Sequence, residues 1–218
     1  TYYFNKLNPF SPSKTAIEKK ATWDMWFKVV AACVPAGVIG LLFNDYMEQF
    51  ENWMVVSATL IIYGIAFIVI ERLHKGSAAR VDSIEDISMG QAFAIGAFQS
   101  LSIVPGTSRS GSTILGSMLV GISRTAAAEF SFFMAIPVMV GASGIKALGF
   151  LSYVSESSVN VPTMAWVVLL VGCAVSFAVS MAAIRFLMDF VKKHSFAPFG
   201  IYRIALGVLV LILGLIRG

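Results

Sequence analysis

Charged residues are scarce in this sequence: Asp, Glu, Lys and Arg make up 13% of its 218 residues, against about 25% in an ordinary soluble domain. Apolar residues make up 57%, above the roughly 45–50% of soluble domains, and the mean hydropathy is +0.81. This balance argues against a soluble domain. It predicts an integral membrane protein whose hydrophobic segments form one all-α bundle, a single domain over residues 1–218.

Cysteine and clustered charge are also nearly lacking. Cys33 and Cys173 both lie in apolar runs, which argues against a disulfide framework, and neither has a partner at metal-ligand spacing. The net charge of +4 sits at segment ends, whereas a nucleic-acid partner requires a clustered basic stripe. We therefore expect no nucleic-acid partner. The chain opens Thr-Tyr-Tyr-Phe, without an initiator Met or a secretory signal pattern, so we expect the protein to begin upstream of it.

Long apolar runs dominate what is present. A span of about 20 apolar residues crosses the hydrocarbon core of a bilayer. Five segments meet this requirement, although the second only just does: 23–43, 53–70, 126–150, 161–187 and 196–216. Two further runs, 92–104 and 114–122, are each too short to cross. Pairs of glycines, Gly37/Gly40, Gly141/Gly144 and Gly207/Gly214, are expected to let helices approach closely.

The charges of the loops indicate how the two short runs are placed. Residues 1–22 carry four lysines against one glutamate, and residues 71–90 also carry basic side chains, so both are assigned to the cytoplasmic side. Segment 126–150 then begins inside, and the chain between must cross an even number of times. This favours a re-entrant hairpin over 92–122 that enters from the cytoplasm. Irregular backbone at that depth must line a cavity or lie within protein.

The tip of this hairpin reads VPGTSRSGST at residues 104–113. Pro105 and Gly106 are expected to end the first short helix, and a Ser or Thr to cap the second within 108–113. A helix N-terminus binds anions, and Arg109 adds a planar fork of donors that suits phosphate. Burying this arginine costs about 2.5–3.5 kcal/mol on insertion scales. Five hydroxyls add further donors: Thr107, Ser108, Ser110, Ser112 and Thr113.

These residues predict an oxyanion cradle at membrane depth, for which a lipid phosphate is the natural ligand. The alternative is a structural Arg109 that pairs with carbonyls freed by the broken helix. Glu129 has two readings, an acid that stabilises a helix start or a carboxylate turned toward the cradle as metal ligand or base. Gln99 is expected to hydrogen-bond within the bundle, and Arg203 to pair internally or to hold phosphate. The cradle contains no histidine or carboxylate. It therefore lacks a base that could activate a nucleophile.

The stretch Pro105–Thr113 resembles the PGxSRSxxT signature of the undecaprenyl pyrophosphate phosphatase family, which is associated with bacitracin resistance. Further matches are AEFSF at 128–132, AIP at 135–137, SF at 195–196 and PFGIYR at 198–203. The resemblance therefore covers essentially the whole chain.

The resemblance implies a multi-pass enzyme of the bacterial cytoplasmic membrane that removes the terminal phosphate from the C55 isoprenoid pyrophosphate. This reaction recycles the lipid carrier for peptidoglycan synthesis. The family fold implies two inverted repeats, each with a re-entrant hairpin, of which 92–122 is the second. It also implies a divalent cation, Mg²⁺ or Ca²⁺, and membrane lipids and a homodimer partner are further expectations. By the signature, Ser108, Arg109, Ser110 and Thr113 are the expected catalytic residues. The expected substrate-binding residues are Gly106, Thr107, Ser112 and Arg203.

The family's first motif, an acid-rich E/Q-xxx-E stretch followed by Ser-Ser-Thr-Gly-His, does not occur in this sequence. The resemblance therefore implies that the metal ligands and the nucleophile or base lie upstream. A rival interpretation from another class is a transporter or flippase of the lipid carrier, because broken half-helices within inverted repeats are also typical of transporters.

Overall fold

The computed structural model describes residues 4–73, 79–157 and 161–217. Among these residues a β-bridge pairs Val81 with Ile122. In chain order the helices are α1 (Phe4–Leu7), α2 (Ala16–Glu48), α3 (Trp53–Leu73), α4 (Met89–Ser100), the 3-10 helix η1 (Leu101–Ile103), α5 (Arg109–Leu119), α6 (Arg124–Glu156), α7 (Thr163–Lys193) and α8 (Ala197–Arg217).

Five helices, α2, α3, α6, α7 and α8, are long and apolar enough to cross a membrane. This confirms the prediction of an all-α polytopic bundle. The helices extend beyond the apolar segments because capped polar turns continue them. For example, α2 begins at Ala16, where Thr15 Oγ1 accepts a bond from the Glu18 N–H at 3.3 Å and the Thr15 N–H donates to Glu18 Oε2 at 2.7 Å. Such a reciprocal pair fixes a helix start without apolar residues.

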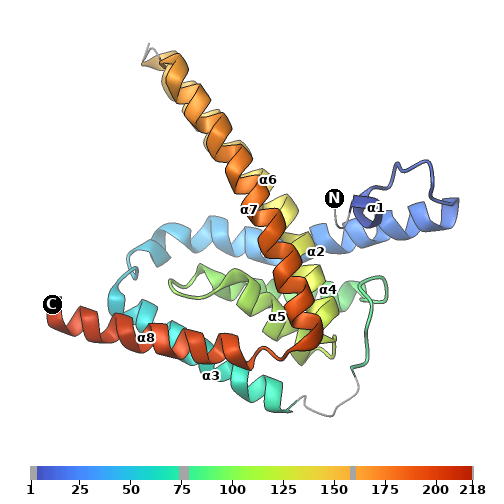
Figure 1. The fold of residues 1–218 in the computed structure, drawn as a ribbon, viewed down its shortest axis with the longest axis horizontal. Coiled ribbons are helices and arrows are strands. Elements are labelled where there is room, and N and C mark those ends of the chain that lie inside the picture. Colours follow the sequence, from blue (N-terminus) through green and yellow to red (C-terminus); the bar gives the residue numbers. More distant parts are fainter. Residues whose placement is uncertain (1–3, 74–78, 158–160, 218) are drawn as a thin grey trace.

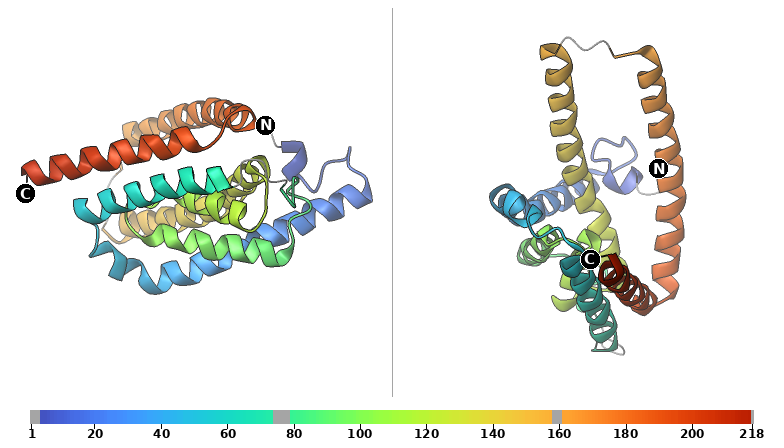
Figure 2. Two further views of the ribbon diagram at one scale, coloured as in Figure 1. Left: turned by 90° about the horizontal axis from the view of Figure 1, so that it is seen from below. Right: turned by 90° about the vertical axis from the view of Figure 1, so that its left-hand side faces the viewer.

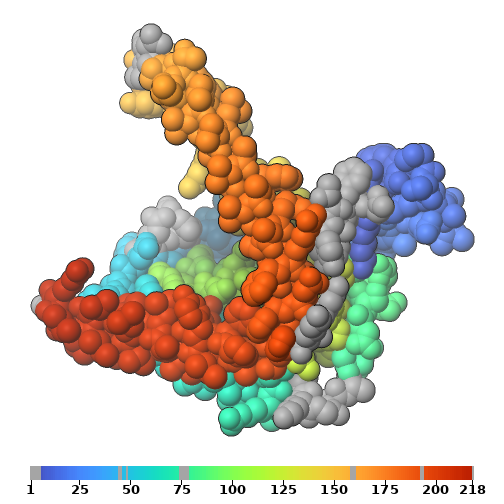
Figure 3. Space-filling model, in the orientation of Figure 1, coloured from blue at the N-terminus to red at the C-terminus, as the bar shows by residue number. Residues whose placement is uncertain are grey.

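The helices are arranged around the short pair α4 and α5. Helix α4 lies against α2, α5 contacts both α3 and α6, and α8 packs along α3 (Figure 1). Helices α6 and α7 run antiparallel, and their far ends project away from the other helices (Figures 1 and 2). In the space-filling view, α7 and α8 cover much of the near face and the projecting ends stand clear of it (Figure 3).

The broken pair has the local structure that its residues predict. Helix α4 and η1 end before Pro105, and Gly106 has a φ of +83°. Ser108 is the N-cap of α5, and its hydroxyl accepts a bond from the Gly111 N–H at 3.1 Å. The second short helix therefore begins at Arg109, before the apolar run at 114, because the polar residues 109–113 form its first turn. The side from which the pair enters the membrane stays a prediction.

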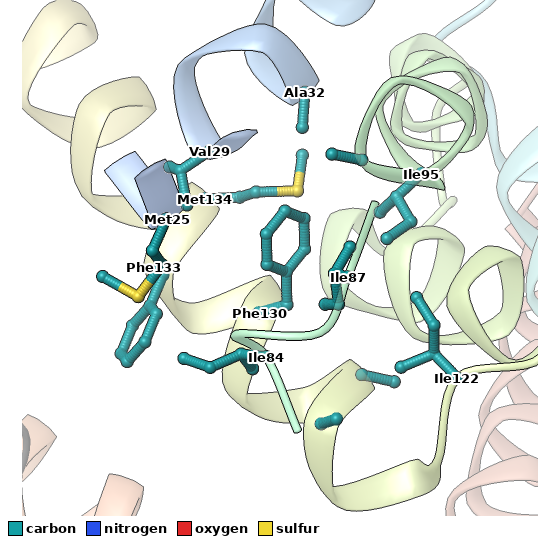
Figure 4. Close-up of a cluster of buried hydrophobic side chains, with 13 residues drawn as sticks. Met25, Val29, Ala32, Ile84, Ile87, Ile95, Ile122, Phe130, Phe133 and Met134 are labelled. Atoms are coloured by element: carbon teal, nitrogen blue, oxygen red, sulfur yellow. The ribbon is translucent and has the colours of Figure 1, made fainter. Parts of the chain in front are cut away.

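A cluster of buried hydrophobic side chains packs against the short helices α4 and α5. Side chains from α2, α4, α6 and the loop before α4 meet there, and Figure 4 shows them in close-up. The members with no exposed surface include Val29, Ile84, Ile87, Ile95 and Phe130. Because interiors are close-packed and resist deformation, this cluster holds the hairpin in position relative to α2 and α6.

Close helix approach occurs at only some of the glycines expected to allow it. A Cβ on Gly207 would lie 2.8 Å from Ile61 Cγ1, and one on Gly214 would overlap the Trp53 ring, so both permit the α3–α8 contact. The expectation is wrong for the pairs Gly37/Gly40 and Gly141/Gly144. No atom of the described residues lies within 4 Å of a Cβ built there, because these positions are on outward faces of α2 and α6.

Candidate functional site

The tip of the hairpin rests on one face of α3. Thr59 Oγ1 donates to the Pro105 carbonyl at 2.8 Å, and a Cβ on Gly106 would lie 2.9 Å from Val56 Cα. Two turns further along the same face, the Phe67 ring lies against Gly111. Residues four apart share a helix face. One face of α3 therefore contacts the non-helical segment between the two short helices and the start of α5.

Arg203 of α8 contacts the tip from the same side. Its Nη2 donates to the Gly106 carbonyl at 2.9 Å, and its guanidinium lies 5.8 Å from the centre of the Tyr63 ring. The Tyr63 hydroxyl accepts a bond from Ser112 Oγ at 3.3 Å. Arg203 therefore pairs internally, as one of its two expected readings requires. The guanidinium carries further donors beyond this bond.

The N-terminus of α5 forms the centre of the tip. The hydroxyls of Ser108 and Ser110 lie 3.2 Å apart, and the N–H groups of the first turn have no carbonyl partner within the helix. Arg109 is the first residue of α5, and it lies close enough to the Cys33 thiol of α2 to interact with it electrostatically. Both arginines thus belong to the surroundings of the positive end of the α5 dipole.

Unpartnered buried donors gather at this tip. Among the described residues, four buried side-chain nitrogen or oxygen atoms have no hydrogen-bond partner: Thr107 Oγ1, Arg109 Nη1, Arg203 Nε and Gln99 Oε1. The first three belong to the tip or contact it. A buried polar group without a partner costs about 1–3 kcal/mol. Such groups call for a specific explanation.

Thr113 and Ser112 lie one turn behind the tip. Thr113 is 1% exposed, and its Oγ1 lies 2.6 Å from Ser131 Oγ of α6 and 3.0 Å from the Ser110 carbonyl. Ser112 is bonded to Tyr63, as described above. Both hydroxyls therefore join α5 to its neighbours, and their roles in handling phosphate stay predictions.

We expect Thr113→Val to lower the stability of the protein, because the change leaves Ser131 without its buried partner. The cost is about 1–3 kcal/mol, which thermal unfolding in detergent measures as a fall of several degrees. Thr113→Ser keeps the hydroxyl and is the matched control. An unchanged midpoint in Thr113→Val would contradict the structural role of this bond.

Glu129 contacts the N-terminal segment, and Gln99 lies on α4 with its Oε1 buried and without a hydrogen-bond partner. Glu129 accepts an ion pair from Lys6 Nζ at 3.1 Å, and the same ammonium lies 3.4 Å from Glu85. Burial alone would raise the pKa of Glu85, but hydrogen bonds from Ser83 and from its own backbone, together with the charge of Lys6, hold that pKa below its usual value. Glu129 thus ties α6 to the N-terminal segment. Gln99 is 3% exposed near the end of α4.

The tip does not fit a divalent metal ion. Mg²⁺ and Ca²⁺ prefer carboxylate and carbonyl oxygens, whereas the tip supplies arginines and hydroxyls. In the part of the chain that the structure describes, no three His, Cys, Asp or Glu side chains come together as a ligand set. A cation dependence of this protein therefore stays a prediction.

Sequence reasoning missed Thr59 and Tyr63. Both lie in the run 53–70, which the sequence presents only as a membrane span. Their spacing of four, with Phe67 four further on, is the signal that a polar face exists there. What that face contacts depends on how α3 crosses α5.

Fold and site together define a class: a multi-pass α-helical membrane protein with a broken helix pair, whose tip is a helix N-terminus that begins with one arginine and is contacted by a second. The sequence model described as bacitracin resistance protein BacA matches residues 1–209. The chain belongs to this family.

Relatives of the chain carry one name. It is 51% identical to the undecaprenyl-diphosphatase of Lactobacillus delbrueckii subsp. bulgaricus, over 98% of this chain and 77% of that protein. It is 49% identical to the undecaprenyl-diphosphatase of Enterococcus faecalis, over 96% of this chain and 75% of that protein. The undecaprenyl-diphosphatase of Streptococcus mutans is also 49% identical, over 99% of this chain and 75% of that protein.

Proposed function

We propose that this protein is an undecaprenyl-diphosphatase, a membrane hydrolase that converts undecaprenyl diphosphate to undecaprenyl phosphate and inorganic phosphate. Membership of the BacA family and about 50% identity to enzymes of that name support this function. The product is the lipid carrier that peptidoglycan synthesis reuses. The name of the family also connects the protein with bacitracin resistance.

The observation that carries the proposal for the site is the group of unpartnered buried donors at the tip. In the proposed complex the terminal phosphate lies at the N-terminus of α5, between Arg109 and Arg203. Ser108 and Ser110 orient its oxygens, Gly106 lets the tip lie close against α3, and Thr107 donates a further bond. Donors placed where charge develops stabilise the transition state of phosphoryl transfer.

In the proposed reaction, the bond between the terminal phosphorus and the bridging oxygen breaks. The bridging oxygen stays with the lipid phosphate, and water supplies the new oxygen of the released phosphate. The attacking group and the ligands of a Mg²⁺ or Ca²⁺ ion are proposed to come from the acidic and histidine motifs of the family, which this sequence does not contain. The chain covers 75–77% of the length of the relatives above.

The chain is a multi-pass membrane protein. We propose that its membrane is the bacterial cytoplasmic membrane, where a polyprenyl diphosphate lipid is its substrate. We also propose that the protein forms a homodimer. A measurement of the mass of the purified protein in detergent tests this proposal. Glu129 and Gln99 have no role in this proposal.

Phosphate release in detergent tests the function. We expect the protein, purified at the length of its relatives, to release inorganic phosphate from undecaprenyl diphosphate in micelles. A micelle has no sides, so a pure transporter of the carrier would release nothing there. The names of the relatives do not favour that rival. Absence of release by folded protein would overturn the proposed function.

Metal removal tests the proposed cation. We expect EDTA to abolish phosphate release, and added Mg²⁺ or Ca²⁺ to restore it. Loss of a metal that neutralises developing charge removes several kcal/mol of transition-state stabilisation. Full turnover in EDTA, with the metal content measured in parallel, would remove the cation from the proposal.

A further inference from the structure

A cavity of about 190 Å³ lies beside the tip, between α5, α7 and α8. Its lining is polar at one end, where Ser108, Ser110 and Arg203 contribute, and apolar at the other, where Ile114 and Leu187 contribute. The polar end consists of residues of the phosphate-binding tip. The cavity is therefore continuous with the site described above.

Three packed phenylalanine rings line the apolar end of the cavity. The ring centres of Phe67 and Phe196 are 6.0 Å apart, and those of Phe196 and Phe199 are also 6.0 Å apart. Phe196 is 4% exposed and belongs to a buried cluster with Phe67. The lining residues Ser110 and Tyr202 are exposed, and Leu187 of α7 and Phe199 of α8 are partly buried. The cavity is therefore open at its polar end, and its apolar side also reaches the surface between α7 and α8.

A packing gap does not explain this lining. Gaps in a core are lined by apolar atoms, whereas here two serine hydroxyls and a guanidinium form one end. A site for phosphate alone does not need the aromatic wall. The two ends together match a molecule in which an anionic group is joined directly to a hydrocarbon chain.

We propose that this cavity binds the isoprene units next to the diphosphate, and that the remaining chain leaves between α7 and α8 into the membrane. The inference rests on the proposed function and adds the path of the lipid to it. Because the cavity is small, only the units nearest the diphosphate contribute to binding. A short prenyl diphosphate then binds about as well as the C55 substrate, and a diphosphate without a chain binds far more weakly.

Leu187→Trp tests this inference, because the larger ring fills the apolar end while the tip is unchanged. The substrates are undecaprenyl diphosphate, farnesyl diphosphate and methyl diphosphate. We expect the KM for both prenyl substrates to rise about 10–100-fold, as burial of one large apolar group predicts, with little change in kcat. The kinetics with methyl diphosphate stay within about twofold of wild type. Leu187→Met conserves volume and is the matched control.

A second variant guards against a folding defect. Phe199→Ala widens the mouth, and we expect it to raise the KM for prenyl substrates but not for methyl diphosphate. Unchanged KM values in folded Leu187→Trp and Phe199→Ala would overturn the inference, as would an equal loss with all three substrates. Failure of the wild-type protein to hydrolyse any of the three would instead overturn the proposed function.

Discussion

Arg109→Lys is expected to abolish nearly all release of phosphate from undecaprenyl diphosphate, with kcat lowered by about 10²–10³-fold, the range found when one oxyanion donor is removed. Lysine keeps the positive charge but replaces the planar fork with a single ammonium group. The buried Nη1 that has no partner in the folded chain is a donor that lysine cannot supply.

The measurement is single-turnover phosphate release in detergent, at equal amounts of folded protein. Arg185→Lys is the matched control, because Arg185 is exposed on α7, and we expect wild-type turnover from it. Wild-type turnover of Arg109→Lys would remove Arg109 from the mechanism. It would leave the structural reading, in which the arginine only satisfies backbone near the break.

Local features of the hairpin were predictable from the sequence. Pro105 and Gly106 end the first short helix and Ser108 caps the second, because these outcomes depend on the residues themselves and their nearest neighbours. The five membrane spans were predictable for the same reason, since length and apolar content alone decide them. Helix ends were less so, because capped turns such as Thr15–Glu18 extend a helix beyond its apolar part.

Contacts between helices were not predictable. Whether Thr113 points to the tip or to Ser131 depends on how α5 is rotated against α6, and periodicity within α5 does not contain that angle. Lys6 and Glu129 are 123 positions apart, so their pairing follows only from the complete fold. The same holds for Tyr63, which becomes part of the site only because α3 and α8 lie together beneath the tip.

Arg203→Lys is expected to lower kcat/KM by about 10–100-fold, which is 1.4 kcal/mol for each factor of ten. Arg203 can bond the Gly106 carbonyl and a phosphate oxygen at once, because its guanidinium has five donors in a fixed plane. A lysine ammonium at the same place reaches one acceptor at the cost of the other. It also loses the guanidinium that lies 5.8 Å from the centre of the Tyr63 ring.

Variants of Tyr63 separate the two roles of Arg203. Tyr63→Phe keeps the ring under the guanidinium and removes only the hydroxyl that accepts from Ser112, so we expect a loss below about fivefold. Tyr63→Leu removes the ring, whose attraction for a cation is about 0.5–2 kcal/mol, and is expected to lower kcat/KM by about 2–30-fold.

Whether the loss of activity in Arg203→Lys appears in KM or in kcat then identifies the role of Arg203. If its guanidinium holds the phosphate already in the bound substrate, Arg203→Lys raises KM and leaves kcat nearly unchanged. If it acts mainly by fixing the Gly106 carbonyl and hence the N-terminus of α5, kcat falls and KM does not. Because the structure gives Arg203 one internal bond and leaves its Nε buried without a partner, we expect both constants to change. An Arg203→Lys enzyme with wild-type values for both would exclude Arg203 from the site.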